Sequence, residues 1–224
     1  MTAKDMFSHR VSILTGHYGT GKTEVSVNLA LALAAEGEQV MLADLDIVNP
    51  YFRSRERRPL LEKAGVRVIS SSQACSDADV PALPAELLTI LENREIRGIL
   101  DIGGDPVGAR VLARFQPKIV QEDYQLIFVL NANRPEVRDA ESAAAYLRSI
   151  EAVTGLTCSG LVNNTHLCGE TTPAEIRKGA ALAQEVSRQT GIPILCHTAE
   201  RRFLESLSDL GCLLYTSPSP RDPK

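Results

Sequence analysis

Val11-Ser-Ile-Leu-Thr15 leads directly into Gly16-His-Tyr-Gly19-Thr-Gly21-Lys22-Thr23, and this stretch indicates the architecture of the chain. The first five residues have the apolar character of a short buried strand. The next eight match the pattern G-x-x-x-x-G-K-[ST], and an alanine- and leucine-rich helical pattern follows over residues 24–36. Glycines let backbone N–H groups turn toward phosphate oxygens, and the start of a helix adds partial positive charge. Strand, loop and helix together predict a phosphate-binding loop rather than an incidental glycine-rich turn. Residues 16–23 are called the phosphate loop below.

Apolar runs and helical patterns alternate along the rest of the chain. Strands are expected at residues 39–43, 66–70, 98–102, 126–130, 156–162 and 192–196, and helices at 53–64, 82–94, 136–153, 173–189 and from 201 to 210. This alternation predicts an α/β fold, a three-layer sandwich whose mostly parallel sheet carries helices on both faces. In such a sheet, ligands bind at the carboxyl ends of the strands.

Composition excludes several classes of protein. The 224 residues are 44% hydrophobic and 23% charged, with a net charge of −4, as in an ordinary globular domain. We expect no nucleic-acid partner, no membrane segment and, because residues 1–10 are polar, no secretory peptide. None of the cysteines forms a Cys-x-x-Cys pair, which favours a reduced, cytoplasmic setting. They are Cys75, Cys158, Cys168, Cys196 and Cys212.

The last thirteen residues differ from everything before them. Residues 212–224 end in a proline-rich string that resembles the translation of a sequencing adapter. The alternative is an ordinary disordered terminus. We therefore expect one nucleotide-binding domain over residues 1–211, truncated at its carboxyl end, and a non-native tail at 212–224.

Acidic residues follow two of the expected strands. Asp44-Leu-Asp46 closes the strand at 39–43, and Asp101-Ile-Gly-Gly104 closes the strand at 98–102. A phosphate loop needs Mg²⁺ ligands, for which the candidates are Thr23, Asp46 and Asp101. Lys22 and Asp46 are the candidate catalytic residues, Lys22 at the β- and γ-phosphates and Asp46 near the attacking water. Turn or helix capping is the alternative role for each aspartate.

At this point the chain resembles the MinD/ParA/cobyrinate-synthase-like group of P-loop nucleotide-binding proteins. The resemblance covers residues 9–211 and rests on the phosphate loop, both acidic motifs and Leu161-Val-Asn163-Asn164. It implies ATP and Mg²⁺ as ligands, and contact between Asn163 and the adenine base, with ordinary turn chemistry as the alternative for Asn163. The residues expected to bind nucleotide are Gly16, His17, Tyr18, Gly19, Thr20, Gly21, Lys22, Thr23, Glu24, Gly104 and Asn163.

One position departs from the group. Many members carry a second lysine directly after the first glycine of the loop, where it reaches across an ATP-sandwiched dimer. His17 occupies that position here. Since a neutral imidazole is no fixed ammonium group, we expect slow hydrolysis by the isolated protein.

Three functions fit these features. The first is a slow Mg²⁺-dependent ATPase that switches a partner protein, with a nucleotide-dependent homodimer as one form of it. The second is an ATP-dependent ligase for a small carboxylate, and the third is a non-hydrolysing nucleotide sensor. The arginines at 53, 55, 57 and 58 either bind an acidic partner or form a solvated helix face, and Arg53 lies nearest the acidic motif. Loop residues His166, Cys168 and His197 are weaker candidates for a metal site.

Overall fold

A computed structural model describes residues 2–45, 54–70, 83–203, 205–211 and 213–216. Its strands are β1 (Val11–Thr15), β2 (Val40–Asp44), β3 (Arg67–Ser70), β4 (Arg97–Asp101), β5 (Tyr124–Leu130), β6 (Cys158–Asn163), β7 (Ile194–Glu200) and β8 (Leu213–Thr216). Its α-helices are α1 (Ala3–Met6), α2 (Lys22–Ala35), α3 (Ser54–Lys63), α4 (Leu83–Glu92), α5 (Pro106–Ala113), α6 (Gln116–Ile119), α7 (Ala140–Thr154) and α8 (Pro173–Thr190). Short 3₁₀ segments are η2 (Pro135–Val137), η3 (Arg201–Phe203) and η4 (Glu205–Leu210).

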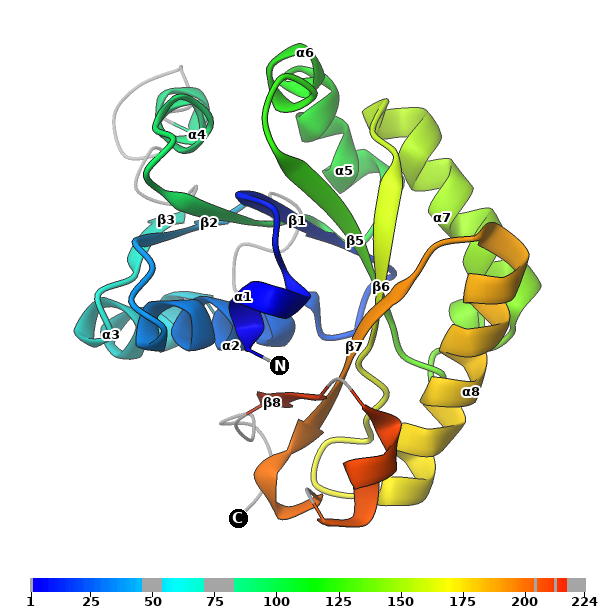
Figure 1. Ribbon diagram of the computed structural model, residues 1–224. Helices are drawn as coiled ribbons and strands as arrows, with labels where there is room; N and C mark the ends of the chain where they lie inside the picture. Colours follow the sequence, from blue (N-terminus) through cyan, green and yellow to red (C-terminus); the bar gives the residue numbers. More distant parts are fainter. Residues whose placement is uncertain (1, 46–53, 71–82, 204, 212, 217–224) are drawn as a thin grey trace.

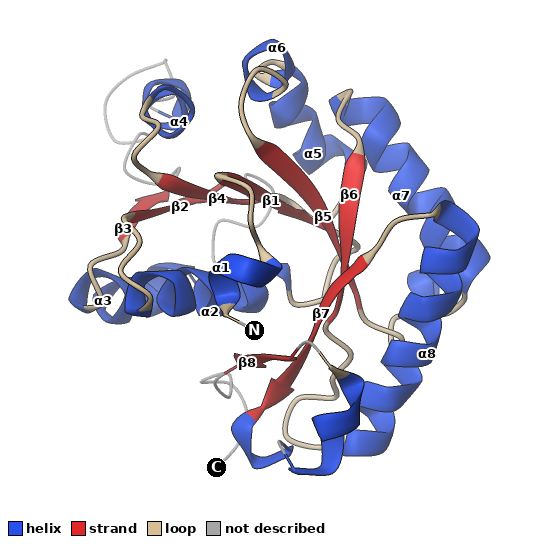
Figure 2. Cartoon of the chain, in the orientation of Figure 1, coloured by secondary structure: helices blue, strands red, loops and turns tan. Residues whose placement is uncertain are grey.

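The described strands form one sheet in the order β3-β2-β4-β1-β5-β6-β7-β8, and every described pair is parallel. β1 therefore lies between β4 and β5, near the middle of the sheet (Figure 1). Helices cover both faces, as Figure 2 shows. The expected α/β sandwich is confirmed.

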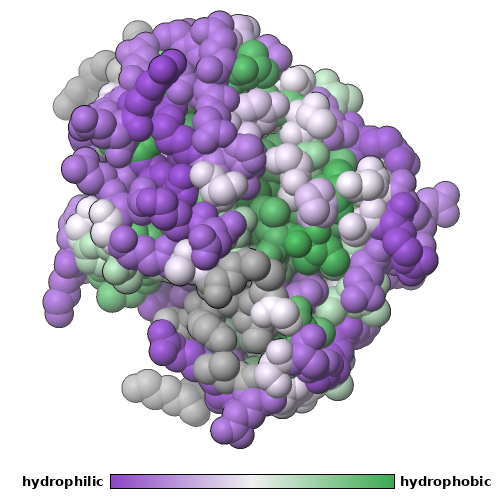
Figure 3. Space-filling model, viewed as in Figure 1, coloured by the Kyte–Doolittle hydropathy of each residue, from purple (hydrophilic) through white to green (hydrophobic). Residues whose placement is uncertain are grey.

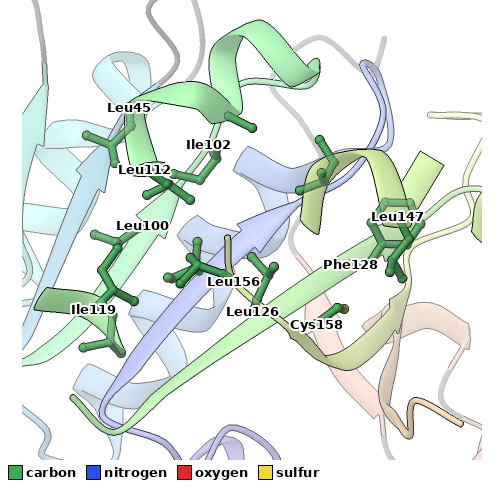
Figure 4. Close-up of a cluster of buried hydrophobic side chains, with 14 of the residues drawn as sticks. Leu45, Leu100, Ile102, Leu112, Ile119, Leu126, Phe128, Leu147, Leu156 and Cys158 are labelled. Atoms are coloured by element: carbon green, nitrogen blue, oxygen red, sulfur yellow. The ribbon is translucent and has the colours of Figure 1, made fainter. Parts of the chain in front are cut away.

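Two apolar clusters hold the layers together. The larger lies between the sheet and helices α4, α5, α7 and α8, and Figure 4 shows part of it around Leu100, Leu126 and Phe128. The second lies between the opposite face and helices α1, α2 and α3. Because neighbouring strand residues point to opposite faces, Leu100 joins the first cluster and Ile99 the second.

Most of the surface drawn in Figure 3 is hydrophilic, with apolar residues gathered near its middle, around β6 and β7. Partly buried apolar side chains packed against the second cluster include Leu31 and Leu195. Among the described helices, none combines the length and the apolar character that crossing a membrane requires.

Several elements differ from expectation. The single helix expected at 136–153 is two segments, η2 and α7, because the side chain of Asp139 accepts a hydrogen bond from the Ser142 amide and caps α7. Helix α5 was not anticipated, although Asp105 caps it and Pro106 occupies its first turn. The expected helix from 201 to 210 consists of η3 and η4.

The carboxyl-terminal stretch also contributes a strand. β8 pairs with β7 in parallel, and the side chain of Leu214 is buried in the second cluster. An exposed sheet edge offers backbone partners to any extended segment, so this pairing is compatible with the proposal that 212–224 is a non-native tail.

Candidate nucleotide-binding site

The phosphate loop joins the end of β1 to the start of α2, and its glycines take backbone conformations that other residues rarely adopt. Gly16, Gly19 and Gly21 have φ values of 145°, 78° and 84°. A Cβ on Gly16 would lie 2.5 Å from the carbonyl oxygen of Val129, so β5 presses directly on the loop. Gly21 begins α2 without any side-chain cap, which leaves backbone N–H groups of the first turn for a ligand.

Hydrogen bonds within the loop converge on one carbonyl group. The Thr20 backbone N–H and hydroxyl donate to the oxygen of His17 at 3.2 and 2.9 Å. Lys22 Nζ donates to the same oxygen at 3.2 Å, and the lysine is only 7% exposed. The ammonium group is thus held inside the ring that the loop makes, where a phosphate group would meet it. Thr23 follows in the first turn of α2, half-buried.

Two polar side chains from distant strands hold the loop from outside. Arg134, in the turn after β5, donates from Nε to the carbonyl oxygen of Gly19 at 2.8 Å. Asn164, directly after β6, donates from Nδ2 to the carbonyl oxygen of Thr20 at 2.7 Å. Sequence reasoning missed Arg134. Its position just after a strand could have marked Arg134 as a candidate binding residue. That inference also needs the order of the strands in the sheet, which places β5 beside β1.

Asn163 lies away from the phosphate loop and is fully buried. Its Nδ2 donates to the Ile176 carbonyl oxygen and to Nδ1 of His197, both at 3.1 Å. Its Oδ1 accepts from the Thr165 amide at 3.1 Å. Since both polar atoms of the side chain have protein partners, this geometry does not support the expected contact between Asn163 and adenine. The neighbouring Asn164 is the residue that reaches the loop.

Asp44 and Asp101 are register partners on the adjacent strands β2 and β4. Asp101 is also in register with Leu14 of β1, whose side chain belongs to the cluster beneath α2. Register partners on parallel strands share a face, so both carboxylates lie on the α2 side of the sheet. Asp101 is 2% exposed. Oxygen ligands at this position, together with Thr23, are the donor set that Mg²⁺ prefers.

Asp46 and Arg53 lie outside the described residues. Of the other arginines in the basic run, Arg58 pairs with Glu62 at 3.0 Å and donates to the Val68 carbonyl oxygen at 2.9 Å. These contacts favour a structural role for Arg58.

Gly104, in the segment after β4, lies against the phosphate loop. A Cβ there would come within 2.8 Å of Lys22 Nζ and within 2.8 Å of the Tyr18 backbone nitrogen. The hydroxyl of Tyr146, on α7, donates to the Gly104 carbonyl oxygen at 2.5 Å. Burial, with the nearby carboxylates of Asp105 and Glu136, raises the pKa of Tyr146 to about 12, so it stays a donor at neutral pH.

The residues at the remaining expected positions have varied surroundings. The ring of His17 contacts the Tyr146 ring edge-on at 5.0 Å, and its Nδ1 lies 3.7 Å from Glu136. Tyr18 is 57% exposed. Glu24 accepts a hydrogen bond from Asn28 Nδ2 at 3.0 Å and lies 4.0 Å from Arg57.

The weaker candidates do not assemble a metal site. The described residues contain no group of three or more His, Cys, Asp or Glu side chains that could hold a metal ion. His166 Nδ1 lies 3.9 Å from Cys168 Sγ in an exposed loop. His197 is on β7 instead, and burial lowers its pKa.

Comparisons with known proteins agree with this geometry. A ParA family model, described as NUBPL iron-transfer P-loop NTPase, matches residues 6–54, which contain the phosphate loop. The cytosolic Fe-S cluster assembly factor cfd1 of Emericella nidulans is 36% identical over 95 residues, 42% of this chain and 26% of that protein. Over residues 6–54, the segment with the phosphate loop, the chain resembles the ParA family of P-loop NTPases. The iron-sulfur cluster carrier protein of Escherichia coli K12 is 50% identical over 40 residues, 18% of this chain and 11% of that protein. The matched part of the chain thus spans about a quarter or less of these curated relatives.

Solved structures share the fold of the chain. A nucleotide-binding protein from Archaeoglobus fulgidus in complex with ADP has a TM-score of 0.51 and 20% identity, over 93% of this chain and 88% of that one. The signal recognition particle 54 kDa protein of Aeropyrum pernix, in complex with GDP, has a TM-score of 0.54 and 24% identity. The match covers 84% of this chain and 40% of that one.

Proposed function

We propose that the chain binds ATP with Mg²⁺, hydrolyses it slowly and acts as a nucleotide switch on a partner protein. The observation that carries the proposal is the meeting of Gly104 with Lys22 and Tyr18 in the phosphate loop. A γ-phosphate beside Lys22 would touch the segment after β4 at the same time. The nucleotide state would then set the position of that segment.

The residues present fit a nucleotide. Gly16, Gly19 and Gly21 shape a cradle that side chains would fill, and α2 offers uncapped N–H groups. Lys22 binds the β- and γ-phosphates and offsets the charge that develops as water attacks. Thr23 and Asp101 would hold Mg²⁺, which supplies further charge neutralisation when bound. Asp46 remains our proposed carboxylate near the attacking water.

ATP is proposed over GTP. Asn163-Asn164-Thr165 lacks the Asn-Lys-x-Asp pattern of guanine readers. Asn164 joins this strand end to the phosphate loop, and both of its polar atoms have protein partners, so we assign it to holding the loop rather than to contact with the base.

The partner is proposed to belong to the maturation of a metal-cluster protein. The names of the curated relatives, Fe-S cluster assembly factor and iron-sulfur cluster carrier, support this class, as the name "cytosolic" supports a cytosolic setting. The family match covers the phosphate-loop segment, so what it supports most directly is nucleotide binding.

Binding and solution mass test the proposal together. The full chain is titrated with ATP, ADP and GTP in Mg²⁺ while its mass is measured, with Lys22→Ala as the variant and exposed Lys63→Ala as the matched control. We expect tight ATP binding that only Lys22→Ala abolishes, and slow phosphate release. A dimer that forms with ATP alone would support the sandwich form of the switch. ATP turnover that rises steeply with a small carboxylate would favour the ligase, and bound ATP without turnover would favour the sensor.

A further inference from the structure

The side chain of Arg134 lies over the phosphate loop at Gly19. A Cβ on Gly19 would come within 2.8, 2.9 and 3.0 Å of its Cζ, Nε and Nη2. The guanidinium group therefore lies directly against the glycine, and any side chain on residue 19 would displace it. The Nε–H bond to the Gly19 carbonyl oxygen, at 2.8 Å, fixes it there.

That bond uses one of five N–H donors of the guanidinium group. The backbone also fixes the start of the side chain, since the Arg134 amide donates to the Asn131 carbonyl oxygen at 3.0 Å in the turn after β5. Arg134 is half-buried, so it gives up part of its hydration in this place. The remaining donors lie next to the loop, where a phosphate group bound in it would accept hydrogen bonds from them.

The charge of Arg134 has no carboxylate partner in the described part of the chain, where no carboxylate oxygen lies within 4.0 Å of its nitrogens. Other half-buried arginines differ: Arg10 pairs with Glu122 at 2.6 Å and Arg97 lies 3.7 Å from Glu38. Lys22 and the amino-terminal end of α2 add positive potential on the same loop. An anion would stabilise the guanidinium group of Arg134, because that group is partly desolvated and lies beside other positive charge. The phosphate loop that it contacts has the pattern of a loop that binds such an anion.

We propose that Arg134 binds the phosphate chain of the nucleotide in the same subunit and supplies the fixed positive charge that His17 does not. This inference rests on the proposed function, because it needs a nucleotide in the loop. It assigns the charge to the turn after β5, the strand next to β1, rather than to a lysine from a second subunit.

Nucleotide titrations of full-length variants test this. Arg134→Gln removes the charge, Arg134→Lys keeps it without the planar group, and Arg138→Gln is the control, since Arg138 lies four residues on with its side chain 75% exposed. The dissociation constant for Mg²⁺–ATP is measured at low and high salt, with thermal unfolding to verify that each variant is folded.

We expect Arg134→Gln to weaken ATP binding by about tenfold to a hundredfold, as for a lost charge-assisted hydrogen bond. The loss should shrink at high salt, Arg134→Lys should recover part of it, and Arg138→Gln should bind as the wild type does. Wild-type affinity in Arg134→Gln would overturn the inference and leave the proposed function standing. Equal losses in the Gln and Lys variants at every salt concentration would also overturn it, since they would assign Arg134 to holding the loop. A wild-type chain that binds no ATP would remove the proposed function itself.

Discussion

The side-chain amide of Asn164 donates a hydrogen bond of 2.7 Å to the carbonyl oxygen of Thr20, across 144 positions of sequence. Its Oδ1 accepts from the hydroxyl of Thr198 on β7. One buried amide thus ties the phosphate loop to the ends of β6 and β7, and it belongs to the framework that keeps the loop open for a phosphate group.

Replacing Asn164 by alanine should therefore cost stability and affinity together. The change leaves the Thr20 carbonyl group and the Thr198 hydroxyl without this partner in a buried place, at a cost of about 1–3 kcal/mol. Thermal unfolding should show a melting temperature several degrees lower, at roughly 2–4 °C for each kcal/mol. ATP should bind more weakly as well. Exposed Asn93→Ala is the control, and an unchanged melting temperature in Asn164→Ala would contradict this account.

Gly104→Ala should disturb the nucleotide site without a large loss of stability. The added methyl group would meet Lys22 Nζ and the Tyr18 backbone at 2.8 Å, so the segment after β4 must move away from the loop. We expect ATP hydrolysis to fall at least tenfold, measured as phosphate release. Gly169→Ala is the matched control because nothing lies within 4 Å of its added Cβ. Wild-type turnover in Gly104→Ala would show that this contact does not bear on hydrolysis.

Tyr146→Phe isolates the hydrogen bond that holds the Gly104 carbonyl group. The ring stays and its contact with His17 is kept, while the donor is lost, so we expect a stability cost of about 1 kcal/mol. Limited proteolysis should cut the segment after β4 faster in the variant without nucleotide, and ATP should restore protection. Equal cleavage rates in both proteins would show that the hydrogen bond from Tyr146 to Gly104 does not hold the segment after β4 in place.

His197 should make the chain less stable in mild acid. Burial lowers its pKa, so the unfolded chain takes up the proton more readily than the folded one. The contribution of His197 to the free energy of unfolding is then fully present above the ordinary histidine pKa of about 6.5, and it is lost as the pH falls below that value. Urea unfolding between pH 7.5 and 5 should give a shallower loss for His197→Gln than for the wild type. Parallel curves would exclude a contribution from His197.

The cysteine thiols should differ sharply in reactivity. Burial raises the pKa of Cys158 to about 12, and Cys196 is fully buried, whereas Cys168 lies exposed beside His166. Because the thiolate is the reactive form, maleimide at pH 7.5 should label Cys168 in the folded chain, and should label the buried Cys158 and Cys196 only after denaturation. Peptide mass spectrometry identifies the sites, and early labelling of Cys158 would be inconsistent with this core.

The phosphate loop, its lysine and the alternation of strands and helices follow from the sequence alone. They depend on local requirements: glycines where φ is positive, an apolar run before them and a helical period after them. Asp101 is placed by the same logic, as the last residue of an apolar strand. The break at Asp139 was missed because the apolar period continues across it, and only the side-chain cap marks the new helix start.

The tertiary structure alone decided which distant side chains reach the loop. Arg134 and Asn164 meet it because β5 lies beside β1 and β6 lies beside β5, an order set by how the apolar faces of all the layers pack against one another. Asn163 and Asn164 are neighbours of the same type, yet one faces His197 and the other faces Thr20. No local pattern separates them, because each amide has a partner more than thirty positions away, His197 for Asn163 and Thr20 for Asn164.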